Sequence, residues 1–179
     1  SSGTSGSSGT SGSSGTSGTS GDLPDASTGR CRASQDDCAP TEDCKVTACG
    51  AEGACVKRPA FEPLAFSPVC GCDGVTYYNE GIAALRGVNL ASGGPCAQPG
   101  AVDCTKGSGC SGDARCNLDR GARASCSGDA AGTCWVLPKD CPAFGPRVRL
   151  CAGGNTCVTA CAAVRDELTF YSQGASGCP

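Results

Sequence analysis

Cysteine is the residue type in this sequence with the most chemistry to offer. The chain of 179 residues contains 18 cysteines and no histidine. Cysteine thiolates bind zinc, commonly as close C-x-x-C pairs or together with histidine, but no C-x-x-C occurs here. Cysteines at this density in a short chain instead indicate a disulfide scaffold. We therefore expect full pairing, no metal, and a protein that is secreted or held at the cell surface, outside the reducing cytosol.

The other residue types exclude several classes of function. Without histidine there is no catalytic triad, and the sequence has no nucleophile motif and no phosphate-binding glycine loop. We therefore expect neither enzyme activity nor a cofactor. The net charge of −3 and the pI near 4.9 give no reason to expect a nucleic acid partner. No apolar run is long enough for a transmembrane segment, which leaves a lipid anchor open as the means of attachment.

Residues 1–30 form a tail and connector rich in serine, glycine and threonine. SSGTSG occurs three times in succession, so glycine falls at every third position from Gly3 to Gly21. This composition predicts a flexible, solvated tether, although a Gly-x-y period is also compatible with polyproline-II packing or a collagen-like helix. Four threonines are candidate sites for O-glycosylation: Thr4, Thr10, Thr16 and Thr19.

The cysteine spacing divides the rest of the chain into two related modules. Module one covers residues 31–96, residues 97–103 are a linker, and module two covers residues 104–179. The segment GACVKRP around Cys55 parallels GTCWVLP around Cys134. We interpret the two modules as a diverged internal duplication.

Few regular elements are available to position these cysteines. Gly81–Leu90 and Thr159–Leu168 contain good helix formers, and each predicts one short helix. A turn at residues 71–74 leads into a short strand at residues 75–77. With one tryptophan, three tyrosines and four phenylalanines, the core is too small to hold either module without covalent staples. The fold class is therefore small and disulfide-rich, with a short helix and a small β-hairpin in each module.

Residues 68–80, PVCGCDGVTYYNE, carry the most specific motif in the chain. The motif resembles the signature of Kazal-type and follistatin-like domains, and the resemblance extends over about residues 55–96. Together with the serine- and glycine-rich tail, it is most similar to Kazal-like proteins of bacterial cell surfaces. Glu62 and Gly81 stand where the family has two cysteines that bond to each other, and Cys72 is an additional cysteine.

The resemblance implies a set of disulfide pairings. The four cysteines before Cys55 lie in a segment similar to the EGF-like hairpin of follistatin-type modules, and they are expected to pair among themselves. In module two the signature is missing, so the pairing there rests on cysteine spacing alone. The expected pairs are Cys55–Cys72 and Cys70–Cys96 in module one, and Cys134–Cys157, Cys141–Cys161 and Cys151–Cys178 in module two.

The resemblance also implies a loop that binds proteases. In Kazal inhibitors, the loop before the third cysteine enters a serine protease as an extended strand. The matching residues here are Pro63, Leu64, Ala65 and Phe66. Leu64 takes the primary specificity position, with Leu64–Ala65 as the scissile bond, and fits a serine protease with a hydrophobic specificity pocket. In module two, Ala143 takes the same place and makes a poor substrate mimic.

Two functions are compatible with these features. The first is an extracellular or surface-anchored structural, protein-binding protein that self-assembles as a filament or surface-layer component, with the tail as a tether. The alternative is a Kazal-type serine protease inhibitor that acts through the Leu64–Ala65 loop. The missing covalent anchor at Glu62 counts against inhibition, because the loop residues regain backbone freedom that binding must remove.

Overall fold

The computed structural model of the chain describes residues 29–32, 37–121, 126, 131–152, 156–172 and 178. Within these ranges the fold consists of short strands, short helices and many turns. The predicted tail lies outside the described residues, and so do all four threonines proposed as glycosylation sites: Thr4, Thr10, Thr16 and Thr19.

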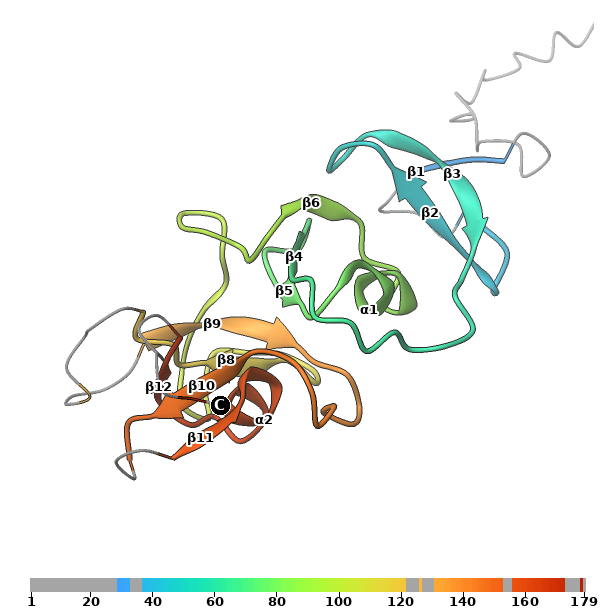
Figure 1. The fold of residues 1–179 in the computed structure, drawn as a ribbon. Coiled ribbons are helices and arrows are strands. Elements are labelled where there is room, and N and C mark those ends of the chain that lie inside the picture. The colour runs from blue at the N-terminus through green and yellow to red at the C-terminus, as the bar shows by residue number, and fades with distance from the viewer. Residues whose placement is uncertain are drawn as a thin grey trace, which may run out of the picture.

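The first described element is a three-stranded antiparallel sheet, drawn in blue and cyan in Figure 1. Its strands have the order β1-β3-β2, and they are β1 (Arg30–Arg32), β2 (Glu42–Val46) and β3 (Glu52–Lys57). Gly53 on β3 pairs with Cys31 on β1. A Cβ atom at Gly53 would lie 2.2 Å from the carbonyl oxygen of Lys45. The close approach of β2 to β3 therefore requires glycine at this position.

The next unit contains the signature segment and a short helix. The strand order is β6-β4-β5, and the elements are β4 (Val69–Gly71), β5 (Thr76–Tyr77), α1 (Glu80–Leu85) and β6 (Leu90–Gly93). The helix predicted over residues 81–90 is present but shorter. It ends early because Gly87 adopts a left-handed conformation (φ 67°), which closes the last helical turn.

The second half of the chain, from β7 to β12, repeats the order in which the strands of the first half pair. Its elements are β7 (Asp103–Thr105), β8 (Arg115–Asn117), β9 (Ala131–Val136), β10 (Arg147–Leu150), β11 (Cys157–Thr159), α2 (Ala160–Arg165) and β12 (Phe170–Tyr171). The order β7-β9-β8 matches β1-β3-β2, and β12-β10-β11 matches β6-β4-β5. The helix predicted over residues 159–168 is α2, again shorter than expected.

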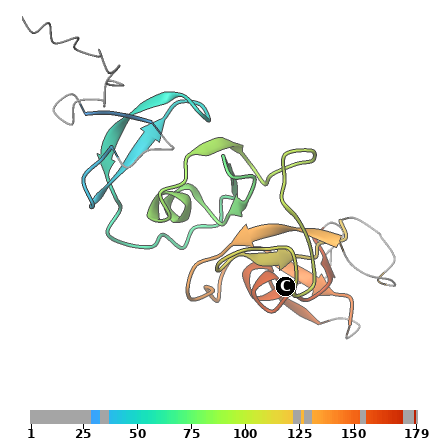
Figure 2. The same cartoon turned by 180° about the vertical axis from the view of Figure 1, so that it is seen from behind.

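One sheet runs through both halves of the described chain. β5 pairs in parallel with β9, with Thr76 opposite Trp135 and Tyr77 opposite Val136. The strand order β6-β4-β5-β9-β7 therefore crosses from one half to the other, with β8 also paired to β9. Both views show the green β4–β6 unit beside the orange strand β9 (Figure 1, Figure 2).

The buried side chains also form a shared core. Tyr78 and Ile82 from the first half belong to the same hydrophobic cluster as Leu118 and Val164 from the second half. All four side chains are nearly inaccessible to solvent. Apolar surface from both halves is thus removed from water at one place, which stabilises their association.

Nine disulfides connect the 18 cysteines, all of which lie within described residues. Cys70–Cys96 and Cys141–Cys161 are present as the resemblance implied. The full set is Cys31–Cys44, Cys38–Cys55, Cys49–Cys72, Cys70–Cys96, Cys104–Cys116, Cys110–Cys134, Cys126–Cys151, Cys141–Cys161 and Cys157–Cys178.

The expected Cys55–Cys72 pair is wrong. Cys55 lies on the middle strand β3 and bonds to Cys38, whereas Cys72 bonds to Cys49. The four cysteines before Cys55 therefore do not pair among themselves, since two of them bond to later cysteines.

Asn89 explains why Cys72 bonds to Cys49. The Asn89 side chain donates a hydrogen bond to the carbonyl of Cys44 (2.8 Å) and accepts one from the amide of Val46 (2.9 Å). The carbonyl of Asn89 accepts a hydrogen bond from the amide of Cys72 (2.8 Å). These bonds hold the end of β2 beside Cys72. The turn after β2, which contains Cys49, is thereby brought within reach.

The expected pairs Cys134–Cys157 and Cys151–Cys178 are also wrong. Cys134 lies on β9, directly opposite Cys116 on β8, while Cys157 lies on β11 in a different sheet. Strand pairing therefore separates the cysteines that were expected to bond. The observed partners of Cys134, Cys151 and Cys157 are Cys110, Cys126 and Cys178, respectively.

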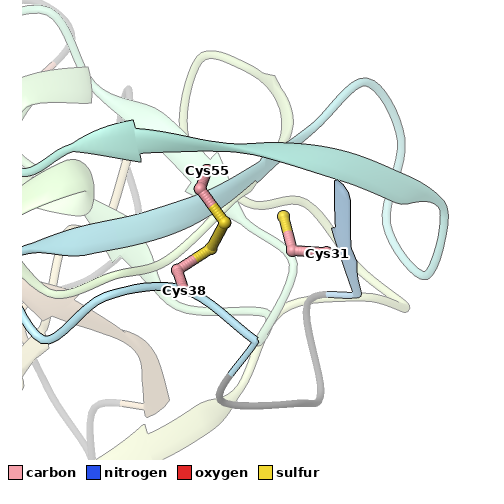
Figure 3. Close-up of side chains that lie close together, drawn as sticks. All are labelled: Cys31, Cys38 and Cys55. Atoms are coloured by element: carbon pink, nitrogen blue, oxygen red, sulfur yellow. A yellow bond between two sulfur atoms is a disulfide. The ribbon is translucent and has the colours of Figure 1, made fainter. Parts of the chain in front are cut away.

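Two disulfides lie side by side at the N-terminal sheet. The sulfur atoms of Cys31, Cys38 and Cys55 lie within 4.8 Å of one another, and Figure 3 shows the Cys38–Cys55 bond next to the sulfur of Cys31. Cys31 is itself bonded to Cys44. A cysteine binds a metal as its thiolate, and these sulfurs are bonded in disulfides, so they form a cluster of crosslinks.

Candidate functional site

The predicted protease-binding loop is an exposed segment between β3 and β4. It lies between Cys55 and Cys70, and no cysteine interrupts it. Leu64 is 39% exposed, and Ala65 beside it is exposed as well. Phe61, three residues before Leu64, is 75% exposed. A large apolar side chain with this exposure is available for contact with another molecule.

Asn79 fixes the backbone on both sides of Leu64. Its side-chain amide donates hydrogen bonds to the carbonyls of Pro63 (2.9 Å) and Ala65 (2.8 Å). The side-chain oxygen of Asn79 accepts a hydrogen bond from the amide of Ile82 (2.9 Å), which makes Asn79 the N-cap of α1. Asn79 is only 5% exposed. One buried side chain therefore ties the loop to the start of the helix.

Sequence reasoning missed this role of Asn79. The residue belongs to the signature segment, and the sequence placed it just before a predicted helix, where asparagine is a favoured N-cap. That position could have revealed the cap. The contacts with Pro63 and Ala65 depend on how the loop folds back over the helix, which no local pattern encodes.

The place of the missing Kazal bridge is filled by packing and a hydrogen bond. A Cβ atom at Gly81 would lie 2.1 Å from the Cγ atom of Pro63, so the proline ring occupies the space next to Gly81. The carboxylate of Glu62 accepts a hydrogen bond from the amide of Lys139 (3.1 Å). The loop therefore keeps contacts on its N-terminal side although it has no covalent anchor there.

Aromatic side chains hold the C-terminal side of the loop. The ring of Phe66 meets the ring of Tyr78 edge-on, with centroids 5.0 Å apart, and lies nearly parallel to Trp135 at 6.5 Å. Such aromatic pairs contribute about 0.5–1.5 kcal/mol beyond the area that they bury. The amide of Ser67 donates a hydrogen bond to the carbonyl of Tyr78 (3.2 Å). Burial raises the pKa of the Tyr78 phenol above its ordinary value.

The signature turn supports the fold behind the loop. The hydroxyl of Tyr77 donates a hydrogen bond to the carboxylate of Asp73 (2.7 Å), which also accepts one from the amide of Val75 (3.1 Å). Gly74 has φ of 76°, a conformation that favours glycine. Burial, and then the hydrogen bond to Asp73, raise the pKa of Tyr77 above its ordinary value.

The corresponding loop of the second half lacks the asparagine. Phe144 there is 63% exposed, and Ala143 beside it is exposed. Thr159 caps α2 as Asn79 caps α1, with its hydroxyl oxygen accepting a hydrogen bond from the amide of Ala162 (3.3 Å). A hydroxyl has a single hydrogen to donate, so Thr159 cannot hold two carbonyls as a primary amide can.

One disulfide connects the two sides of the Leu64–Ala65 bond. Cys49–Cys72 joins a residue before Leu64 to a residue after Ala65. Each of the other eight disulfides lies wholly on one side of that bond. The two parts of a chain cut at Leu64–Ala65 would therefore remain joined through Cys49–Cys72.

The fold and the site together define a small disulfide-rich protein that presents an anchored, exposed loop. The chain is 39% identical over 62 residues to serine protease inhibitor Kazal-type 1 of Mus musculus, and the match covers 31% of this chain and 75% of the mouse protein. The chain therefore belongs to the Kazal-type family. No family model matches the sequence, and no solved structure matches the fold.

The disulfides also indicate where in or outside the cell the protein functions. Nine disulfides, with none of the cysteines free, persist in oxidising environments and indicate an extracellular protein. Among the described residues, no helix is long and apolar enough to cross a bilayer. The mouse relative is, by its name, a serine protease inhibitor.

Proposed function

We propose that the protein inhibits serine proteases through the Leu64–Ala65 loop. The observation that carries this proposal is the pair of hydrogen bonds from Asn79 to the carbonyls of Pro63 and Ala65, on either side of an exposed Leu64. A loop held in its bound shape before binding loses little conformational entropy when a partner binds it. The similarity to a Kazal-type serine protease inhibitor also supports this proposal.

The proposed mechanism is that of a substrate which is released poorly. The catalytic serine of the protease attacks the carbonyl carbon of Leu64, and the bond to the Ala65 nitrogen breaks as that nitrogen takes up a proton. Asn79 keeps hold of Pro63 and Ala65, and Cys49–Cys72 keeps both parts in one molecule. The new amine therefore stays next to the acyl group, which favours resealing over release.

The loop composition suggests the class of protease. Leu64 suits a hydrophobic primary pocket, of the kind found in subtilisin and chymotrypsin. Phe61 lies three residues before Leu64 and is even more exposed, so it is available for a second apolar pocket further along an extended binding groove. We propose a target with two such pockets.

We further propose that the chain consists of two tandem, diverged Kazal-like modules, residues 31–96 and 104–179, joined by residues 97–103. The matching strand orders and the matching helix caps at Asn79 and Thr159 support this division. The filament or surface-layer role depends on the tail, which lies outside the described residues, and no described residue favours it. That role, with its lipid anchor, stays a prediction.

The proposal is tested by titrating subtilisin and chymotrypsin with the recombinant chain. We expect stoichiometric loss of protease activity for the wild type and a loss of inhibition of at least about a hundredfold for Leu64→Gly, because leucine fills the primary pocket and glycine leaves it empty. Ala143→Gly, in the corresponding loop of the second half, serves as the matched control and should inhibit like the wild type. Full protease activity at micromolar concentrations of the chain would contradict the proposal.

A further inference from the structure

We infer that the second half of the chain positions the inhibitory loop, through the indole of Trp135 and the backbone amide of Lys139. This inference rests on the proposed function and adds to it a set of positioning residues that lie outside the loop. Its consequence is that substitutions in the second half change the strength of inhibition, although those residues do not need to touch the protease.

The loop needs such support because it is long and free of crosslinks. Between Cys55 and Cys70 the chain has no cysteine. Within its own half, the loop is held by non-covalent contacts alone: the hydrogen bonds of Asn79, the packing of Pro63 over Gly81, and the contacts of Phe66 and Ser67 with Tyr78. Each backbone residue left free to move costs about 1–2 kcal/mol when binding orders it. Contacts at both ends of the loop therefore have a direct effect on affinity.

The second half contacts the loop at both of those ends. On the N-terminal side, the amide of Lys139 donates to the carboxylate of Glu62, two residues before Leu64. On the C-terminal side, the ring of Phe66, two residues after Leu64, stacks on Trp135 with an interplanar angle of 15°. The two contacts bracket the scissile bond.

A chain of backbone hydrogen bonds strengthens the C-terminal contact. The carbonyl of Val136 accepts a hydrogen bond from the amide of Tyr78 (3.0 Å), and the carbonyl of Tyr78 accepts one from the amide of Ser67 (3.2 Å). Strand β9 is thus connected to the loop through a single residue of the first half.

Trp135 itself is held firmly in the fold. It is 7% exposed and pairs with Thr76 across the β5–β9 junction. Its indole nitrogen donates a hydrogen bond to the hydroxyl of Thr133 (3.2 Å). A side chain that is buried, hydrogen-bonded and carried on a paired strand provides a rigid surface for Phe66, whereas a mobile one would not.

The first test compares Trp135→Leu with Trp135→Phe in the full chain. Leucine removes the stacking on Phe66, while phenylalanine keeps an aromatic face. We expect Trp135→Leu to weaken inhibition of subtilisin by about tenfold or more, and to speed cleavage of the Leu64–Ala65 bond by a similar factor. Trp135→Phe should inhibit subtilisin nearly as strongly as the wild type and should be cleaved at Leu64–Ala65 nearly as slowly. If Trp135→Leu inhibits subtilisin as strongly as the wild type does, the inference is overturned.

The second test uses Glu62, because replacing a half-exposed side chain does not threaten folding. Glu62→Ala removes the acceptor for the Lys139 amide, while Glu62→Gln keeps a carbonyl oxygen at the same place. We expect weaker inhibition by Glu62→Ala and near wild-type inhibition by Glu62→Gln. This pair decides the question if Trp135→Leu fails to fold, and equal inhibition by the two variants would then count against the inference.

Hydrogen exchange of the loop, without protease, separates this inference from the proposed function. The Ser67 amide should lose protection in Trp135→Leu, while amides of the distant β2–β3 pair keep theirs. If the wild type does not inhibit but Ser67 loses protection, the proposed function fails and the positioning role stands. If the wild type inhibits and Ser67 protection is unchanged in Trp135→Leu, the positioning role fails and the proposed function stands.

Discussion

At the residue scale, Asn79 performs two tasks with different atoms of one side chain. Its oxygen caps α1 by accepting from the amide of Ile82, and its nitrogen donates to the carbonyls of Pro63 and Ala65. The cap stabilises the helix, and the two donated bonds hold the loop. Because the tasks use different atoms, substitutions can separate them.

Asn79→Asp should remove the loop contacts and keep the cap. A carboxylate still accepts from the Ile82 amide, but it has no hydrogen to donate to the two carbonyls. Each lost hydrogen bond contributes about 1 kcal/mol, and the buried carboxylate also repels the two carbonyl oxygens, so we expect inhibition constants to rise by at least about thirtyfold and the melting temperature to fall. Asn79→Ala, the control, should lose both inhibition and about 1 kcal/mol of stability. Wild-type inhibition by Asn79→Asp would show that the two donated bonds do not matter.

Tyr77 gives the fold a pH dependence at alkaline pH. Burial and the hydrogen bond to Asp73 raise its pKa above the ordinary value of about 10. Above that pH the unfolded chain releases the phenol proton while the folded chain retains it, so the unfolded state is favoured. The stability that depends on this group is fully present below about pH 10 and is lost as the pH rises further.

We therefore expect the urea midpoint to stay constant from neutral pH to about pH 9 and to fall above about pH 10. Tyr77→Phe removes the titrating group, so its midpoint should be lower at neutral pH, because the bond to Asp73 is lost, and should fall less steeply at alkaline pH. Urea denaturation followed by circular dichroism at several pH values measures both. If the urea midpoint falls equally steeply with alkaline pH in the wild type and in Tyr77→Phe, the role given to Tyr77 is contradicted.

At the scale of elements, the disulfide between the β2–β3 turn and the residue after β4 has a special position. Cys49–Cys72 is the disulfide that crosses the Leu64–Ala65 bond. Once a protease cuts that bond, Cys49–Cys72 keeps the new ends in one molecule. Without it, only non-covalent contacts such as those of Asn79 and Glu62 would do so.

Replacing both Cys49 and Cys72 by serine should convert lasting inhibition into temporary inhibition. We expect initial inhibition close to wild type, followed by recovery of protease activity as the cut chain separates, and a stability loss of about 3 kcal/mol. Replacing Cys31 and Cys44 by serine is the matched control, because that bridge lies wholly before Leu64. Progress curves over several hours measure the difference. Equally lasting inhibition by both double variants would contradict the proposed resealing.

Elements with local causes could be predicted from the sequence. The two short helices follow from alanine-rich segments, and the signature turn follows from Asp73-Gly74. Disulfide pairing was predicted less well, because it depends on which cysteines the strand register brings together. Hydrogen bonds from Asn89 hold β2 near Cys72, whose partner Cys49 follows β2, and no spacing rule contains that information.

At the scale of the whole molecule, the two halves share a sheet and a core. The parallel pairing of β5 with β9 and the contact of Phe66 with Trp135 join segments that are far apart in the sequence. Sequence patterns could suggest two modules, but not that the modules pack together. The contacts between them are made by individual residues that lie far apart in the sequence. Leu64 of the candidate loop is exposed, and the supports of the loop on the second half were not foreseen from the sequence.

A shared core predicts that the β4–β12 region unfolds in one cooperative step. In scanning calorimetry with disulfides intact, we expect a single transition whose calorimetric and van't Hoff enthalpies agree. Trp135→Leu should lower the midpoint of that transition as a whole, because the core residues of both halves are packed in one cluster. Two separable transitions, only one of which moves in the variant, would show that the halves fold independently.

The most direct test of the account is to follow an equimolar mixture of the chain and subtilisin by mass spectrometry and residual activity. We predict that protease activity stays blocked, that a single slow cut appears between Leu64 and Ala65, and that chain cut there beforehand is resealed to the intact form. Rapid cleavage at several loop bonds, with subtilisin fully active, would contradict the claim that Asn79 and its neighbours hold the loop ready for binding.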